Sequence, residues 1–226
     1  LLDTDMVAMR PLDADMLERC ARLGAAAFDI SDQVFPAYGS TRVITDLEVV
    51  AGRRLANPRW YGGEFLLCTQ GFLKLLVPRG KVCFTRYVAH VHHLHHNGDE
   101  AFVSAALSML VDEGQPIVDV GAYQAVGRHW PGNTHRNLDW FRRCAFLHLP
   151  GNKELIERES HRPEFDPDRL WRMLWIAHKV GRVRAMVKSL LKRPTPRLRE
   201  MSGKSNRSKK RIGEKLRTTA ERDAST

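Results

Sequence analysis

The chain has 226 residues, 43% of them hydrophobic, which is enough to bury a core in one large domain or two small ones. Its four cysteines form no C-x-x-C pair and no run of 18 apolar residues occurs, which argues against a zinc ribbon, a disulfide framework and a membrane span, and favours the cytoplasm. The net charge of +10 belongs to the C-terminal end, because residues 179–226 hold 16 Lys and Arg against 4 Asp and Glu.

Helices and strands are expected to alternate along the rest of the chain. Periodic apolar patterns with capping residues predict helices over residues 13–24, 46–55, 69–77, 81–96, 100–114, 152–160 and 168–192. A strand end is expected at residues 1–3, and short apolar runs predict strands over residues 116–120, 125–130 and 144–149. This mixture predicts an α/β fold in which helices cover a sheet.

The chain opens with "LLDTDMVAMRPLD", in which two aspartates are separated by one residue. Side chains at i and i+2 of an extended segment point the same way, so Asp3 and Asp5 can project together from a strand end. Their carboxylates suit Mg²⁺ or Mn²⁺, which in turn binds phosphate oxygens. The alternative is a surface loop with two solvated acids.

A second motif, "FLHLPGNKELIERES", lies far downstream. The predicted strand ends at His148, the chain turns at Pro150 and Gly151, and a helix begins with Asn152 as its N-cap. The amino end of a helix, with Lys153 beside it, is a phosphate-binding arrangement. His148 is a candidate ligand for the cation that Asp3 and Asp5 would hold, although a purely structural histidine is the alternative.

These two motifs together resemble the metal-dependent glycosyltransferases of the GT-A fold, closest to the family 8 type. The resemblance implies that Asp3, Asp5 and His148 hold Mn²⁺ or Mg²⁺ on the diphosphate of a nucleotide-sugar donor, and that Gly151 and Lys153 contact its phosphates. The family spacing H-x-x-G-x-x-K is one residue longer than "HLPGNK" here. The implied fold is Rossmann-like, and the nucleotide-binding strands would lie upstream of Leu1, so the chain alone is expected to be inactive.

Two further segments carry the resemblance. "WYGGEFLL" places Gly62 and Gly63 where the family backbone approaches the donor sugar, and an ordinary tight turn is the alternative. "NGDEAFVSAAL" places Asp99 and Glu100 under the sugar ring as the implied catalytic carboxylates, and a favourable acidic first turn of a helix is the alternative.

Two other functions start from the same residues. "LLDTDMV" also fits the opening motif of haloacid-dehalogenase-type phosphatases, with Asp3 as nucleophile and Asp5 as acid/base, but the later acidic pair that such enzymes need is missing from "VDEGQPIVDV" and "GDEAFVS". A basic nucleic-acid-binding protein is the third hypothesis. Aromatic residues for base stacking would then be expected among the basic ones, and none follows Trp175.

The remaining features concern metal and membrane binding. "HVHHLHH" puts His92 and His96 four residues apart on a predicted helix, which is either a zinc pair or a solvated polar face. We predict a glycosyltransferase portion over residues 1–165, a basic amphipathic helix over 166–193 and a disordered basic tail over 194–226. The helix either packs on the body or binds anionic membranes peripherally, near a glycan or lipid-linked acceptor.

Overall fold

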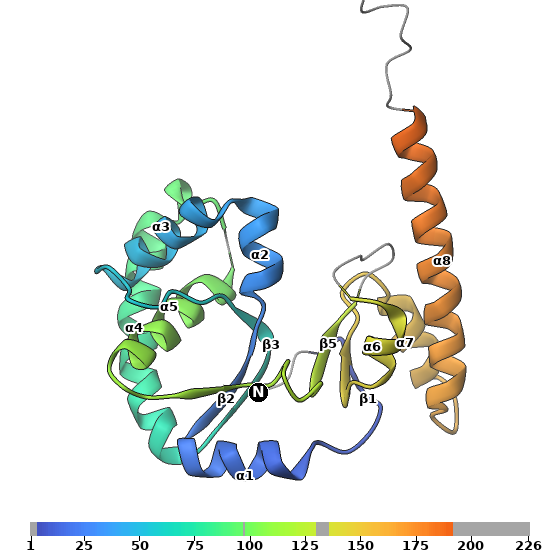
Figure 1. Ribbon diagram of the computed structural model, residues 1–226, viewed down its shortest axis with the longest axis horizontal. Helices are drawn as coiled ribbons and strands as arrows, with labels where there is room; N and C mark the ends of the chain where they lie inside the picture. Colours follow the sequence, from blue (N-terminus) through green and yellow to red (C-terminus); the bar gives the residue numbers. More distant parts are fainter. Residues whose placement is uncertain (1–3, 97, 130–135, 192–226) are drawn as a thin grey trace, which may run out of the picture. The chain divides into compact units, whose positions relative to one another are not determined.

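The computed structural model describes residues 4–96, 98–129 and 136–191 (Figure 1). The chain divides into two units between Val180 and Gly181. The strands are β1 (Met6–Ala8), β2 (Ala25–Asp29), β3 (Tyr61–Cys68), β4 (Ile117–Asp119), β5 (Val126–Arg128) and β6 (Phe146–His148). The α-helices are α1 (Ala14–Leu23), α2 (Ser31–Tyr38), α3 (Ser40–Ala51), α4 (Gln70–His90), α5 (Asp99–Asp112), α6 (Leu138–Arg142), α7 (Lys153–Ser160) and α8 (Pro167–Leu191). The predicted disordered tail and the strand end at residues 1–3 lie outside the described residues.

The strands form two small mixed sheets, so the predicted α/β class is confirmed. In the first sheet, with the order β3-β2-β4, β2 is antiparallel to β3 and parallel to β4. In the second, with the order β1-β6-β5, β6 is antiparallel to β1 and parallel to β5. Helices α3, α4 and α5 pack together beside the first sheet, and α1 contacts all three of its strands (Figure 1).

Helix α1 follows its sequence signals closely. Asp13 is its N-cap and accepts a hydrogen bond from the backbone N–H of Met16 at 3.1 Å, while Gly24 ends the helix with a φ of 103°. Such a positive φ is favourable only for glycine. The buried Met16 and Cys20 lie four residues apart and face the first core.

Helix α4 corrects two predictions at once. The helices expected over residues 69–77 and 81–96 form one continuous helix with Pro78 inside it, and this helix ends at His90. Leu76 and Cys83, on either side of the proline, are both buried in the first core. Tertiary packing therefore outweighs the backbone hydrogen bond that proline cannot donate. The helix expected over residues 46–55 begins earlier, at Ser40, and ends at Ala51.

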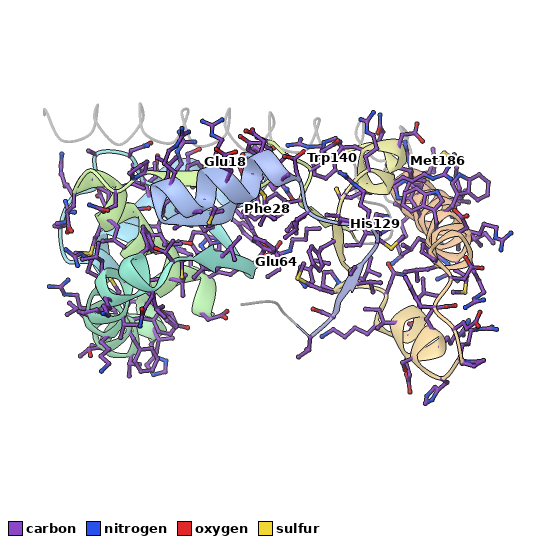
Figure 2. The ribbon with its side chains drawn as sticks, turned by 90° about the horizontal axis from the view of Figure 1, so that it is seen from below. Glu18, Phe28, Glu64, His129, Trp140 and Met186 are labelled. Carbon is purple, nitrogen blue, oxygen red and sulfur yellow. The ribbon has the colours of Figure 1, made fainter. Side chains whose placement is uncertain are left out.

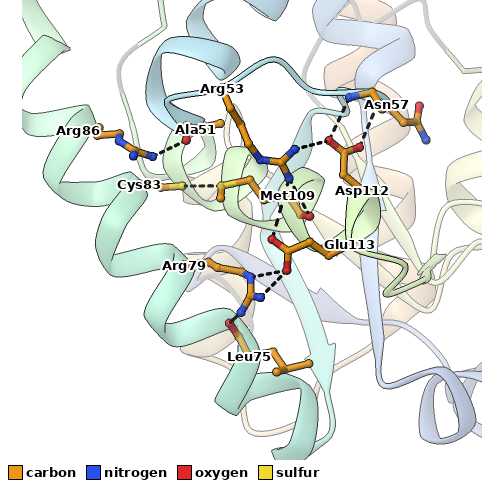
Figure 3. Close-up of polar contacts among 11 residues, drawn as sticks. Ala51, Arg53, Asn57, Leu75, Arg79, Cys83, Arg86, Met109, Asp112 and Glu113 are labelled. Atoms are coloured by element: carbon orange, nitrogen blue, oxygen red, sulfur yellow. Dashed lines mark hydrogen bonds and ion pairs between the residues drawn. The ribbon is translucent and has the colours of Figure 1, made fainter.

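A polar network ties α5 to the segment after α3 and to α4 (Figure 3). The carboxylate of Asp112 accepts hydrogen bonds from the backbone N–H groups of Ala56 and Asn57 at 3.0 and 3.2 Å, and from Arg53 at 3.2 Å. Glu113 pairs with Arg79 on α4. These contacts fix the carboxyl end of α5, whose amino end reaches the candidate site.

The second core lies between β6, α6, α7 and the first turns of α8, and Leu147, Leu149, Leu170 and Leu174 are buried in it. The predicted helix over residues 168–192 matches α8 closely. Beyond Leu174 the apolar spacing continues, but Ile176 and Val180 are exposed. Within the part of the chain that the structure describes, no helix has both the length and the apolarity needed to cross a membrane.

Candidate functional site

The predicted cation ligands meet where β1 pairs with β6. Asp5 lies in the turn before β1, and Met6 stands opposite His148 in the antiparallel register. The backbone carbonyl of Asp5 accepts a hydrogen bond from Leu149 at 3.0 Å, which fixes the turn. Asp3 lies outside the described residues, so its position relative to Asp5 stays a prediction.

Asp5 contacts both of the residues that the downstream motif supplies. One carboxylate oxygen is 2.9 Å from Nε2 of His148 and the other is 3.1 Å from Nζ of Lys153. Asp5 and His148 are 6% and 4% exposed, whereas the Lys153 side chain is 68% exposed at the first residue of α7. The structure thus brings three sequence-predicted site residues together, with the ammonium group of Lys153 on the solvent side.

Electrostatics make this cluster an ionised one. Burial alone would raise the pKa of Asp5, but its hydrogen bond with Lys153 and the charges of His148 and Lys153 hold that pKa below its usual value. For His148, burial would lower the pKa, but the neighbouring carboxylates of Glu64 and Asp5 raise it despite an opposing effect of Arg128. Asp5 and His148 therefore each favour the charged form of the other.

Glu64 is the site residue that our sequence analysis missed. It lies on β3, is 1% exposed, and its Oε1 is 3.6 Å from Nδ1 of His148 (Figure 2). Within the described part of the chain, neither carboxylate oxygen of Glu64 has a hydrogen-bond partner. A lone acid inside the apolar strand "YGGEFLLC" was the available signal, because carboxylates are almost never buried without a partner or a role.

His148 and Asp5 form an ion pair, so a divalent cation held by both residues would have to displace the proton from Nε2 of His148. Ligand atoms at adjacent positions on an octahedral Mg²⁺ or Mn²⁺ lie about 3 Å apart, which matches the separation of Nε2 of His148 from Asp5. A metal-bound histidine usually presents its other ring nitrogen to a carboxylate, as His148 does to Glu64. Among the described residues, no group of three or more His, Cys, Asp or Glu side chains is arranged to hold a metal, and the third predicted ligand, Asp3, is not among them.

A pocket of about 790 Å³ collects the other predicted residues, a volume typical of ligand sites. Asp99, Glu100 and Gly151 all line it, together with Arg128. Asp5, His148 and Lys153 are not among its lining residues, and they adjoin it through the Pro150–Gly151 turn. The candidate phosphate turn and the candidate sugar-binding carboxylates therefore share one cavity.

Glu100 is held in place from two sides. Nε1 of Trp60 donates a hydrogen bond to its Oε2 at 2.9 Å, and Arg128 forms an ion pair with its Oε1 at 3.1 Å. Arg128 stands beside His148 in the parallel register of β5 and β6. Arg128 was also missed by the sequence analysis, because the spacing of "AVGRHW" shows only a strand. It links the carboxylate at the pocket to the strand that carries His148.

Gly62 and Gly63 have different surroundings, although the sequence analysis gave them one role. A Cβ on Gly62 would lie 2.1 Å from Oε2 of Glu64, whereas a Cβ on Gly63 would meet Glu100 at 3.4 Å and Asp99 at 3.5 Å. The second pair of distances is ordinary contact. Gly62 therefore makes room for the buried Glu64 carboxylate, and Gly63 borders the carboxylates of the pocket.

The histidine-rich segment is not the helix that was predicted. His92 belongs to a 3-10 turn, Val91–His93, while His95 and His96 follow it and bind Asp46. Asp46 is 3% exposed and accepts the backbone N–H groups of His95 and His96 at 2.9 and 3.2 Å. The i,i+4 zinc pair therefore loses its helical basis, and His96 is not part of a solvated helix face.

Asn152 also departs from its prediction. It occupies the N-cap position of α7, but its side chain makes no capping hydrogen bond, and within the described chain its buried Oδ1 lacks a hydrogen-bond partner.

Comparisons with known proteins do not extend these observations: no family model, curated protein or solved structure matches the chain.

Proposed function

We propose that this protein is a metal-dependent glycosyltransferase that moves a sugar from a nucleotide-diphosphate sugar to a glycan or lipid-linked acceptor. The observation that carries the proposal is the convergence of Asp5, His148 and Lys153 beside the Pro150–Gly151 turn, which lines the same pocket as Asp99 and Glu100. Under this proposal, residues 1–165 correspond to the C-terminal portion of a GT-A domain.

Asp5 and His148, with Asp3, would hold Mn²⁺ or Mg²⁺, which when bound neutralises the charge of the departing nucleoside diphosphate. Lys153 would supply a second positive charge to the same phosphates. Its side chain is 68% exposed, and its ammonium group forms an ion pair with Asp5. It can therefore reach a ligand that arrives from solvent. The backbone at Gly151 and the amino end of α7 complete the anion site.

Asp99 and Glu100 would act on the sugar. Carboxylates near a ring that develops oxocarbenium character stabilise the positive charge. The carboxylate of Glu100 is held by Trp60 and Arg128, so it does not have to change its position when a ligand enters. The hydroxyl groups of a donor sugar are natural partners for both carboxylates.

The test is donor turnover by the protein, measured as release of the nucleoside diphosphate from nucleotide sugars with Mn²⁺. We expect chelation to abolish release and Asp5→Asn to lower turnover by about two orders of magnitude. Lys153→Ala should raise the donor KM and lower kcat without changing the metal requirement. Asp15→Asn, which removes an exposed acid of α1, is the matched control.

Metal-independent release, or a wild-type rate in Asp5→Asn, would refute the proposal. A covalent phosphate on Asp3 would instead support the phosphatase alternative, in which Asp5 donates a proton. The contacts that lower the pKa of Asp5 do not favour that role, because they stabilise the ionised form.

We also propose that α8 attaches the protein peripherally to anionic membranes. Ile176, Val180, Val183, Val187 and Leu190 follow a 4-3-4-3 spacing and are exposed. Basic side chains accompany them along the helix, at Arg172, Lys179, Arg182, Arg184 and Lys188. An exposed apolar stripe among basic residues suits the interface of an anionic bilayer.

A further inference from the structure

One wall of the pocket that contains Asp99 and Glu100 is apolar and comes from a single helix face. Ile30, at the N-cap position of α2, and Val34, Ala37 and Tyr38 within the helix line it. The spacing of four, three and one residues keeps these positions on one side of the helix. Tyr38 is 55% exposed, whereas Ile30 and Val34 are buried, so the tyrosine stands where this wall meets solvent.

The exposed tyrosine is supported from behind by His96. The two rings meet edge to face, with centroids 4.4 Å apart and an interplanar angle of 89°. On its other side, His96 packs against Trp60 with centroids 5.1 Å apart. The three rings are therefore packed in series, and the exposed Tyr38 stands at one end of the series.

The wall is anchored by a buried carboxylate. Asp46 lies 3.2 Å from Nδ1 of His96 and also accepts the backbone N–H groups of His95 and His96. The His96 side chain is only 11% exposed, so its ring has little room to move. Trp60 is held by its hydrogen bond to Glu100. The rings of His96 and Trp60 are therefore held in place before a ligand enters.

The rest of the pocket lining includes polar side chains with charges of both signs. Asp99, Glu100 and Arg128 supply carboxylate acceptors and a guanidinium donor next to Trp60, and Gln33 adds an amide from α2 itself. A pyranose ring matches this division, because one face presents C–H groups to an aromatic surface while its hydroxyl groups point outward to polar side chains. An apolar ligand would make no use of these polar groups, and a linear polyol would make poor use of the rings.

We infer that the Tyr38 end of this pocket, with His96 and Trp60 behind it, binds a pyranose ring of the acceptor. The inference rests on the proposed function, under which the donor sugar stays attached to its diphosphate beside Gly151. A second sugar has to enter from solvent, and Tyr38 is the exposed aromatic residue on that route. The acceptor class is thus a saccharide, and not a protein side chain or a bare lipid alcohol.

The test is saturation-transfer NMR on the 226-residue chain, titrated with the methyl pyranosides of glucose, galactose and mannose. Sorbitol, which has the hydroxyl groups but no ring, is the control ligand. We expect at least one pyranoside to bind and sorbitol not to bind. Tyr38→Ala should weaken binding about tenfold and Tyr38→Phe should preserve it, because the ring face and not the hydroxyl makes the contact.

Phe84→Ala is the matched control variant, since Phe84 is a similarly exposed aromatic residue of α4 that does not line the pocket. Equal loss in Tyr38→Ala and Phe84→Ala, or no pyranoside binding by the wild type, would overturn the inference. Mn²⁺ binding, followed in parallel with Asp5→Asn, separates the two proposals. Pyranoside binding without any Mn²⁺ site would leave a saccharide-binding pocket and remove the transferase.

Discussion

Glu64 and His148 face each other across the two sheets, with Oε1 of the buried carboxylate 3.6 Å from Nδ1 of the imidazole. The other ring nitrogen of His148 faces Asp5. The imidazole is therefore oriented by one carboxylate while it presents Nε2 to the site. Such an outer carboxylate fixes the tautomer and direction of a metal-binding histidine.

Replacing Glu64 by glutamine should lower Mn²⁺ affinity about tenfold to a hundredfold, since the side chain keeps its shape but loses the charge that orients His148. The measurement is the free-Mn²⁺ signal in electron paramagnetic resonance during titration of the chain. Asp15→Asn should leave the titration unchanged. Unaltered affinity in Glu64→Gln would mean that His148 needs no support from β3.

The two neighbouring glycines should respond unequally to alanine. In Gly62→Ala the new Cβ would lie 2.1 Å from the Glu64 carboxylate and force it away from His148, whereas Gly63→Ala meets its neighbours at ordinary contact distance. We expect weaker Mn²⁺ binding in Gly62→Ala and little change in Gly63→Ala. In a Glu64→Ala background, Gly62→Ala should have no additional effect on Mn²⁺ binding, and a full additive loss would contradict the coupling.

The sequence predicted the parts of the fold whose signals are local. Asp13 and Gly24 mark the ends of α1 through capping chemistry that needs no tertiary contact. Strand β2, Ala25–Asp29, was missed because three successive alanines carry little strand preference, and their burial between β3 and β4 depends on the rest of the sheet. The predicted helix end at Pro78 was wrong for the same reason. The helix continues through the proline because residues on both sides of it are buried in the first core.

The candidate site divides in a similar way. Residues that belong to short motifs, such as Asp5, His148 and Lys153, could be named from spacing, and the structure brings them together. Glu64 and Arg128 act through partners more than 20 residues away in sequence, so no motif spacing identifies their roles, and only the lone acid in an apolar strand marked Glu64. Tyr38 became a candidate binding residue only when the structure showed its ring packed against His96.

A buried histidine in the second core should make stability depend on pH. Burial and, to a lesser extent, the charge of His178 lower the pKa of His129 to about 4. Below about pH 6.5 the unfolded chain binds a proton at this position that the folded chain does not bind until about pH 4. The folded state is therefore destabilised as the pH falls through this window, by about 2 kcal/mol between pH 7 and pH 5.

The measurement is urea unfolding of the wild type and His129→Gln at both pH values. Glutamine keeps a polar side chain near Nδ1 of His178, 3.3 Å from the native ring, but does not titrate. Because other groups titrate in both proteins, the informative quantity is the difference between them. We expect His129→Gln to lose less stability than the wild type on acidification, and equal losses would show that His129 is protonated in the folded state.

The exposed stripe of α8 leads to a prediction about membranes. The chain should co-sediment with vesicles that contain phosphatidylserine and not with vesicles of phosphatidylcholine alone, because the basic residues supply about 1 kcal/mol each near an anionic surface. Val183→Glu should weaken binding by about tenfold, since it removes an apolar contact with the bilayer and adds a negative charge that anionic lipids repel. Deleting residues 194–226 should weaken it further at low salt and less at high salt, because exposed charges are screened. Val49→Glu, on the exposed surface of α3, is the control variant and should bind as the wild type does. If binding depends neither on salt nor on lipid charge and is unchanged in Val183→Glu, α8 is not the attachment helix.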